Sequence, residues 1–489
     1  MRFYKKKLFF IFLIMLFGCS KYNGASDPLI YTPLTANSYW INNKSKKADE
    51  TSCGLQSEKK DPCLQEYSLA ELIDTALTNN PDTQSSWAQA QTAAALYGQS
   101  LSPYYPTIDF NASLYRRRAT ISTFNSYGVT QNGNTLPYYY ETRGGPEIDL
   151  SYTLLDFGKR KSSSDEALQS LHYANWMHNR EIQSVMQIVM DDYYNYLYEI
   201  EAVTASSQDL ITAQKSLDAA NTRYEAGVAS IADVMQAKTT YLQTKIQYNN
   251  QKQQKIDAYA TLLKDIGLPS NKILSINPLP EEIETKDIIA SLDDLISLSM
   301  HYRQDLLATV ANVKAKEASF EYAKALERPD FGAHLNVGKF YYDDMKTEDY
   351  HYNAQVNLTF PIFKGFFYKN GIRKAKADFE KAQAALKQLE LSIVQDITIS
   401  KSTVETSASN LQDSKDYYES AKTQYEISLS QYRAGVSTIL DLLSSQSALA
   451  DARAKKALAK RDWFQSLSTL AYATGSLCLK ENYETRSIK

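Results

Sequence analysis

Four stretches of the chain alternate between apolar and polar side chains at every second residue. They lie within residues 106–115, 147–154, 332–337 and 353–360. Their apolar members are Ile108, Phe110, Ala112 and Leu114, then Ile148, Leu150, Tyr152 and Leu154, then Ala333, Leu335 and Val337, and finally Ala354, Val356, Leu358 and Phe360. Because successive side chains of a strand point to opposite faces, each stretch predicts a strand with one apolar and one polar face.

The surroundings of these strands favour a membrane-inserted sheet over a soluble sandwich, although a sandwich would show the same alternation. Tyrosines gather near the predicted strand ends, as they do at membrane interfaces. They are Tyr104, Tyr105, Tyr115, Tyr138, Tyr139, Tyr140, Tyr341, Tyr342 and Tyr350. Four strands cannot close a membrane barrel, since the smallest known kind needs about eight. We therefore expect an oligomer, and three copies would supply about 12 strands around a polar lumen, whereas two would make a narrow, filled barrel.

A second pattern repeats every seventh residue and predicts long helices that supercoil. Its first run is Val189, Tyr196, Val203, Leu210, Leu217 and Tyr224, and its second is Ile397, Val404, Leu411, Tyr418, Tyr425 and Tyr432. Small residues accompany the second run at Ser400, Ser407, Ser414, Ala421 and Ser428, where they would let another helix approach closely. A helix from Lys159 to Tyr224 would be roughly 100 Å long. This length suggests a tunnel wall, and the alternative is a solid coiled-coil stalk.

Two near copies of one motif mark the ends of these helices. YEAGVASIADV occupies residues 224–234, and YRAGVSTILDL occupies residues 432–442. Each contains an Ala-Gly pair that ends a helix, followed by a residue suited to cap the next one, Ser230 or Thr438. Other pairs with similar spacing are Leu69 and Leu292, Pro106 and Pro329, and Gly158 and Gly365. The chain is thus predicted to be an internal duplication, with an extra loop near Asn132 in the first copy.

Composition excludes several classes of function. The formal net charge of −3 gives no positive field for nucleic acid, so no nucleic-acid partner is expected. Only 5 histidines occur among 489 residues, and we interpret His172, His178, His301, His334 and His351 as scattered. No phosphate-binding loop, nucleophile motif or zinc spacing is present, so we expect neither an enzyme nor a metal or other cofactor.

The N-terminus has the features of an export signal. Basic residues precede an apolar run from Leu8 to Gly18, which is too short for a stable membrane span. The sequence LFGCS that ends it resembles a bacterial lipoprotein box and implies lipidation of Cys19, with an ordinary signal peptide as the alternative. Since export permits disulfides, Cys53 and Cys63 are either a local pair or free thiols.

The ordered set of helices, strands and AGV tips from Tyr67 to Gly475 resembles the TolC-like outer membrane efflux protein family. The resemblance implies a mixed α and β membrane protein whose helix-strand-strand-helix unit occurs twice. It also implies a homotrimer with a 12-stranded β-barrel in the outer membrane, continuous with a periplasmic α-helical coiled-coil barrel. The implied partners are outer membrane lipid, a periplasmic adaptor (membrane fusion protein) and an inner-membrane efflux pump.

The same resemblance implies roles for residues of the two tips. Asp441 falls at an inward-facing ring carboxylate of a periplasmic gate, Tyr432 at a linking tyrosine, and Asp233 at the partner of that tyrosine. Asp441 as an ordinary first-turn acid of a helix is the alternative. Ser437 and Ser444 replace a gate-locking arginine and a second ring carboxylate, which implies fewer charged links. The expected tip and adaptor contacts are Tyr224, Gly227, Val228, Gly435 and Val436.

We accordingly expect five segments and one main function. They are a lipoprotein signal peptide at 1–18, a lipid-anchored extended tether at 19–66, a first repeat at 67–286, a second repeat at 287–476 and a C-terminal tail at 477–489. The predicted function is a passive trimeric duct that exports small molecules from the inner-membrane pump. A duct for type I protein secretion and a coiled-coil surface lipoprotein without a pore are the alternatives. Drugs, metals and polypeptides all remain open as cargo.

Overall fold

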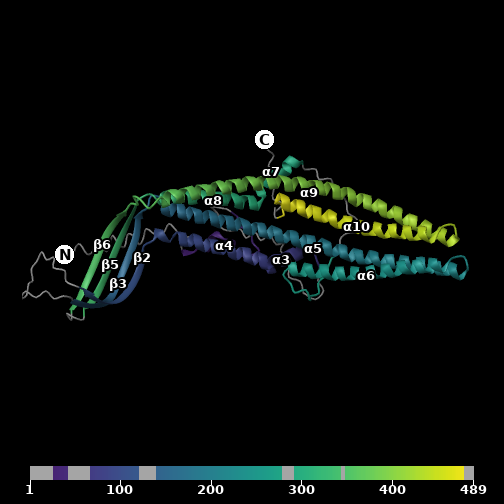
Figure 1. Ribbon diagram of the computed structural model, residues 1–489, viewed down its shortest axis with the longest axis horizontal. Helices are drawn as coiled ribbons and strands as arrows, with labels where there is room; N and C mark the ends of the chain where they lie inside the picture. Colours follow the sequence, from purple (N-terminus) through teal and green to yellow (C-terminus); the bar gives the residue numbers. More distant parts are fainter. Residues whose placement is uncertain (1–25, 42–65, 120–138, 278–290, 343–346, 478–489) are drawn as a thin grey trace, which may run out of the picture. The chain divides into compact units, whose positions relative to one another are not determined.

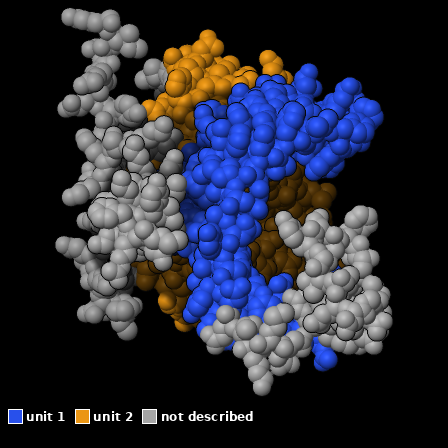
Figure 2. Space-filling model, turned by 90° about the vertical axis from the view of Figure 1, so that its left-hand side faces the viewer, with its two compact units in different colours: residues 1–31, 92–171, 311–383 blue, residues 32–91, 172–310, 384–489 orange. Residues whose placement is uncertain are grey.

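The computed structural model describes residues 26–41, 66–119, 139–277, 291–342 and 347–477, which fall into two compact units (Figures 1 and 2). The sheet unit comprises residues 1–31, 92–171 and 311–383, and the helical unit comprises residues 32–91, 172–310 and 384–489. Cys19, Cys53, Cys63 and the loop near Asn132 lie outside the described residues. None of the helices in the described ranges is both long and apolar enough to cross a membrane.

The sheet unit contains one antiparallel sheet with the strand order β2-β3-β5-β6 (Figure 1). Its strands are β2 (Thr107–Ala119), β3 (Tyr139–Leu155), β5 (Asp330–Tyr342) and β6 (Thr347–Thr359). The prediction of four strands is therefore confirmed. Because β2 continues to Ala119, Tyr115 lies inside a strand rather than at its end, which the sequence pattern had missed. Within this sheet β2 and β6 are the edge strands, so each has one side without a strand partner.

The two faces of the sheet differ sharply in polarity. Residues directly opposite one another in the register share a face, so Ile108, Leu150, Leu335 and Ala354 lie on one side. Large apolar side chains on this side are exposed, with Leu114 at 86% and Tyr352 at 80%. A soluble sandwich would bury such a face against a second sheet. In the single chain the apolar face is left uncovered.

Two antiparallel helical hairpins provide most of the helical unit, and their helices α5 and α9 begin in residues 159–171 and 367–383 of the sheet unit (Figure 1). The first joins α5 (Lys159–Glu225) to α6 (Ile231–Asp265), and the second joins α9 (Phe367–Ala434) to α10 (Ile439–Thr474). The long helix predicted from Lys159 to Tyr224 is confirmed and ends one residue later. Shorter helices precede each strand pair, namely α3 (Leu69–Asn79), α4 (Pro81–Ser100), α7 (Leu292–Tyr302) and α8 (Gln304–Ala325). Two-residue strands β1 (Glu66–Tyr67) and β4 (Ser275–Ile276) pair in parallel.

The heptad prediction is correct for α9 and only partly correct for α5. In α9, Ile397, Val404 and Leu411 are buried, and the accompanying Ser407 lies 2.8 Å, oxygen to oxygen, from Ser466 of α10. In α5 the predicted Val189 is buried in the core. Farther along the helix the buried seven-residue stripe comprises Ser206, Ala213 and Ala220, three positions after the predicted one, and Tyr224 is 46% exposed. Where two helices pack closely, small side chains occupy the contact. The larger residues of α5 therefore lie beside this contact.

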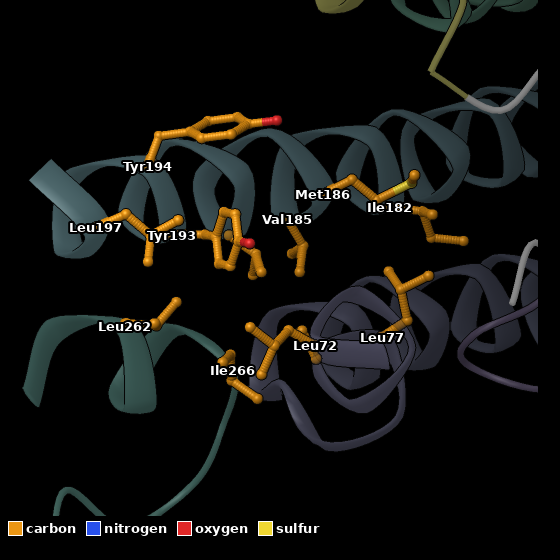
Figure 3. Packing of buried hydrophobic residues seen from close by; sticks show 12 residues of the cluster. Leu72, Leu77, Ile182, Val185, Met186, Tyr193, Tyr194, Leu197, Leu262 and Ile266 are labelled. Atoms are coloured by element: carbon orange, nitrogen blue, oxygen red, sulfur yellow. The ribbon is translucent and has the colours of Figure 1, made fainter. Parts of the chain in front are cut away.

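Three apolar clusters form the core of the helical unit. Figure 3 shows the first, in which Leu72 and Leu77 of α3 face Ile182 and Val185 of α5, with Leu262 of α6 close by. A second cluster joins α5, α6, α9 and α10, and a third joins α7 and α8 to α9 and α10. The core therefore ties the short helices to both hairpins.

A chain of buried charges adds a polar link between the same helices. Arg303, at the start of α8, donates to Asp305 (2.7 Å) and to Asp396 of α9 (3.0 Å). Arg180 of α5 lies 3.8 Å from Asp305, and its guanidinium lies 3.5 Å from the ring centroid of Tyr472. Burial alone would raise the pKa of Asp305, but the hydrogen bond from Arg303 and the charges of both arginines lower it.

Part of the predicted tether is bound to the helices. The Asn179 amide accepts from the Trp40 backbone N–H and donates to its carbonyl, both at 2.8 Å. The Trp87 indole donates to the Pro33 carbonyl at 3.0 Å. Residues 33–40 are thus held by α4 and α5 through contacts to the backbone of the segment. Because backbone atoms make these contacts, the sequence of the segment needs no repeating pattern.

Candidate functional site: hairpin tips and the polar sheet face

The same backbone conformation and the same type of hydrogen bond form the turn at both hairpin tips. Gly227 (φ 76°) and Gly435 (φ 84°) adopt the left-handed conformation that glycine tolerates best. The N–H of Val228 donates to the Arg223 carbonyl, and that of Val436 donates to the Gln431 carbonyl, each at 3.0 Å. These bonds satisfy carbonyls at the helix ends, as in a Schellman motif. The next helix therefore starts in the reverse direction within a few residues.

The predicted gate carboxylates Asp233 and Asp441 each cap their own helix. Asp441 accepts from the Thr438 hydroxyl (2.7 Å) and N–H (3.0 Å), while its own N–H donates to Thr438 Oγ1 (3.3 Å). Ser230 and Asp233 form the same reciprocal capping box. Hydrogen bonds from the Thr438 side chain and backbone lower the pKa of Asp441. Asp441 is thus a first-turn acid in the single chain, and its place in a ring stays a prediction.

Tyr432 is enclosed between the two hairpins. It is 2% exposed and packs in the cluster shared by α5, α6, α9 and α10. Burial raises the pKa of its phenol, while the charge of Arg223 lowers it and that of Asp233 raises it. Its hydroxyl has no hydrogen-bond partner in the described part of the chain, so the predicted link to Asp233 is not formed here.

Arg223 makes the link between the hairpins that the sequence analysis assigned to Asp233. Its guanidinium lies 4.7 Å from the Tyr432 ring centroid and donates to the Tyr432 carbonyl, and it also donates to the Val228 carbonyl at 3.4 Å. The second motif has Gln431 at the corresponding position. This difference between the two copies was the sequence signal that could have identified Arg223.

The remaining predicted tip residues are accessible. Val228 is 63% exposed and Val436 is 78% exposed, and Gly227 and Gly435 are exposed as well. Ser444 is exposed, and no hydrogen-bond partner for the Ser437 hydroxyl occurs in the described ranges. Neither serine supplies a charged link. In the described part of the chain, Arg223 is the cation that contacts both tips, through the carbonyls of Tyr432 and Val228.

The polar face of the sheet assembles residues that the sequence analysis considered scattered. Asn336 of β5 donates to Glu147 (3.0 Å) and Asp149 (2.6 Å) of β3. The Nε2 atom of His351 (β6) lies 2.9 Å from Asn336 Oδ1 and 3.7 Å from Glu147, and that of His334 (β5) lies 3.6 Å from Asp149. Asn111 of β2 also donates to Asp149, at 2.7 Å. The interpretation of all five histidines as scattered is therefore wrong for two of them.

Cross-strand pairing explains why the sequence analysis missed this cluster. Its members come from four strands separated by up to 240 residues, and only the register places them opposite one another. Among the described residues, no group of three or more His, Cys, Asp or Glu side chains is arranged so that it could hold a metal ion.

Comparisons with known proteins agree with this architecture. The family model described as outer membrane efflux protein matches residues 72–268 and 295–476. Protein CyaE of Bordetella pertussis is 26% identical over 406 residues, covering 81% of each chain. The probable efflux pump outer membrane protein TtgC of Pseudomonas putida is 24% identical over 333 residues, covering 66% of this chain and 63% of TtgC.

The fold is also that of a solved channel. The structure of the Campylobacter jejuni CmeC outer membrane channel superposes with a TM-score of 0.73 at 19% identity, covering 90% of this chain and 95% of that one. The two matched segments of the family model each span helices, a strand pair and a hairpin. The chain belongs to the outer membrane efflux protein family, a family of channel proteins and not of enzymes.

Proposed function

We propose that this chain is the outer membrane duct of a tripartite efflux system and that it works as a homotrimer. The observation that carries the proposal is the sheet. Its exposed apolar face suits contact with lipid, whereas its unpaired edge strands β2 and β6 are incompatible with a monomer there. Three copies joined edge to edge would supply about 12 strands and close the barrel. The polar faces would then line an aqueous lumen.

The hairpins support the periplasmic half of this proposal. Each tip presents an exposed valine, Val228 or Val436, on a short turn braced by a capping box. Exposed apolar side chains on a rigid turn suit contact with a periplasmic adaptor, which would connect the duct to an inner-membrane pump. Asp441 would face the axis of the entrance as a ring of three carboxylates, which favours cations. Free energy for export would come from the pump.

Lipidation of Cys19 would supply the second membrane attachment. A single acyl signal holds a protein in a membrane only weakly. A closed barrel inserted in the same membrane would make the attachment stable. Residues 33–40 are held by α4 and α5, so the segment after the lipid would be anchored at both ends.

The decisive test is the native mass of the full-length protein extracted from outer membranes in mild detergent. We expect a trimer whose subunits carry acyl chains, and a Cys19→Ser variant should lose the acyl mass while it remains trimeric. A monomeric wild-type protein, or one recovered without detergent, would refute the proposed duct. A trimer without acyl chains would refute only the lipidation of Cys19.

A further inference from the structure

The polar face of the sheet carries an organised set of charges. Each of its two imidazoles faces a carboxylate of β3, His334 toward Asp149 and His351 toward Glu147. Asn336 lies at the centre and bonds to both carboxylates and to His351. Four strands contribute to this set, which we call the histidine–carboxylate network. It consists of Asn111, Glu147, Asp149, His334, Asn336 and His351.

The neighbours of His351 on the sheet leave a space that fits its imidazole ring. The ring of Phe340 stacks on that of His351 with centroids 4.2 Å apart and an angle of 4° between planes. Opposite His351 the chain has Gly338, where an added Cβ would lie 2.4 Å from His351 Cε1 and 2.8 Å from Glu147 Cβ. Any larger residue at 338 would displace the ring. The position of His351 beside Glu147 is therefore fixed by its neighbours.

Carboxylates outnumber guanidiniums on this face. The register places Asp109, Glu141, Glu147, Asp149 and Asp349 there without a lysine partner in the described part of the chain, and the guanidiniums of the face are those of Arg117 and Arg143. Asp330 also lies on this face but pairs with Lys159 at 2.9 Å. Five negative and two positive charges leave −3 with neutral imidazoles, and two protonated imidazoles bring the sum to −1.

We infer that His334 and His351 make the ion selectivity of the duct depend on protons, an inference that rests on the proposed barrel. In three copies, these charges of the lumen face would sum to −9 with neutral imidazoles and to −3 with both imidazoles protonated. A more negative lumen concentrates cations more strongly. Because each imidazole already faces a carboxylate, protonation changes the charge in place and needs no rearrangement of the strands.

The measurement is the reversal potential of the purified trimer in a planar bilayer under a potassium chloride gradient, at about pH 7.5 and about pH 5, which lie on either side of histidine titration. The wild type should prefer cations at the higher pH and show a clearly weaker preference at the lower pH. The double variant His334→Gln with His351→Gln should keep the preference at both. His301→Gln, on the exposed side of α7, is the matched control and should behave as the wild type.

Single variants at His334 and His351 should each lose about half of the shift, since each removes one of two charges per chain. The inference is overturned if the wild type shows no shift, or if the double variant retains the full shift. Asp441 at the tips cannot imitate the effect, because its pKa is lowered and its carboxylate stays charged at about pH 5. A wild type without conductance at either pH would refute the duct itself, and the inference with it.

Discussion

The carboxylate of Asp305 forms ion pairs with two buried arginines. Arg303 and Arg180 both direct their guanidinium groups toward it, and their side chains are only 5% and 10% exposed. Removing one partner of a buried ion pair costs about 3 kcal/mol or more. Without Asp305, Arg303 would keep its bond to Asp396, whereas Arg180 would keep only neutral partners such as the Tyr472 ring. We expect Asp305→Asn to lower the thermal midpoint of the helical circular dichroism signal in detergent. Asp293→Asn, an exposed change on α7, should leave that midpoint in place.

Asp192 on α5 should make the stability of the helical unit depend on pH. Burial, together with the hydrogen bond and negative charge of Asp265, raises the pKa of Asp192 to about 7. A carboxyl whose folded pKa exceeds its unfolded value of about 3.9 holds its proton more tightly when folded, so stability falls as pH rises from about 4 through 7. The thermal midpoint should therefore be higher at about pH 5 than at about pH 7.5.

The variant Asp192→Asn isolates this contribution. It should stabilise the protein at about pH 7.5, by about 1 kcal/mol once solvent screening of a partly exposed group is allowed for, and it should shrink the difference between the two pH values. Asp218→Asn, at an exposed position of the same helix, should do neither. An unchanged pH difference in the Asp192 variant would show that another group causes it.

At the level of elements, Arg223 links the two hairpins at their tips, whereas Arg453 and Lys460 of α10 pair with Asp209 and Glu201 of α5 farther along the helices. Arg223→Gln removes both the cation over the Tyr432 ring and the fork that bonds to its carbonyl. Together these contacts amount to about 1.5 kcal/mol, so the equilibrium between closed and open tips should shift about tenfold. We expect a larger basal conductance in planar bilayers. Arg433→Gln, an exposed change on the second hairpin, is the control.

Tyr432→Phe distinguishes the Arg223 link from the link that the family resemblance implies. The variant keeps the ring and the carbonyl and loses only a hydroxyl that has no described partner. Its conductance should stay near the wild-type value. If it opens the channel as far as Arg223→Gln does, the hydroxyl is bonded in the assembled trimer, as the predicted pairing with Asp233 requires.

The elements themselves were largely predictable, because their patterns are local. Alternation identified the strands, and the AGV motifs placed both hairpin tips at Gly227 and Gly435. The register of α5 was not predictable in this way. A seven-residue period is compatible with several stripes, and only the partner helices select the small side chains Ser206, Ala213 and Ala220 for the contact.

The candidate sites were less predictable than the elements because they depend on contacts distant in sequence. His334 and His351 meet Glu147 and Asp149 only through the strand register. Arg223 meets Tyr432 only because α5 and α9 pack in one cluster. Asp233 and Asp441, by contrast, were identified from sequence and lie at the tips, but the structure gives each a capping role within its own hairpin.

For the whole molecule, the arginine that links the hairpin tips has a consequence for symmetry. The helix and strand order occurs twice in the chain, so three chains would place six similar hairpins around the axis. Arg223 has no counterpart in the second hairpin, so the first hairpin provides the cation and the second provides the ring that receives it. The six hairpins would thus alternate between two kinds. An entrance built from them would have threefold and not sixfold symmetry, and it would open by the separation of three equivalent pairs.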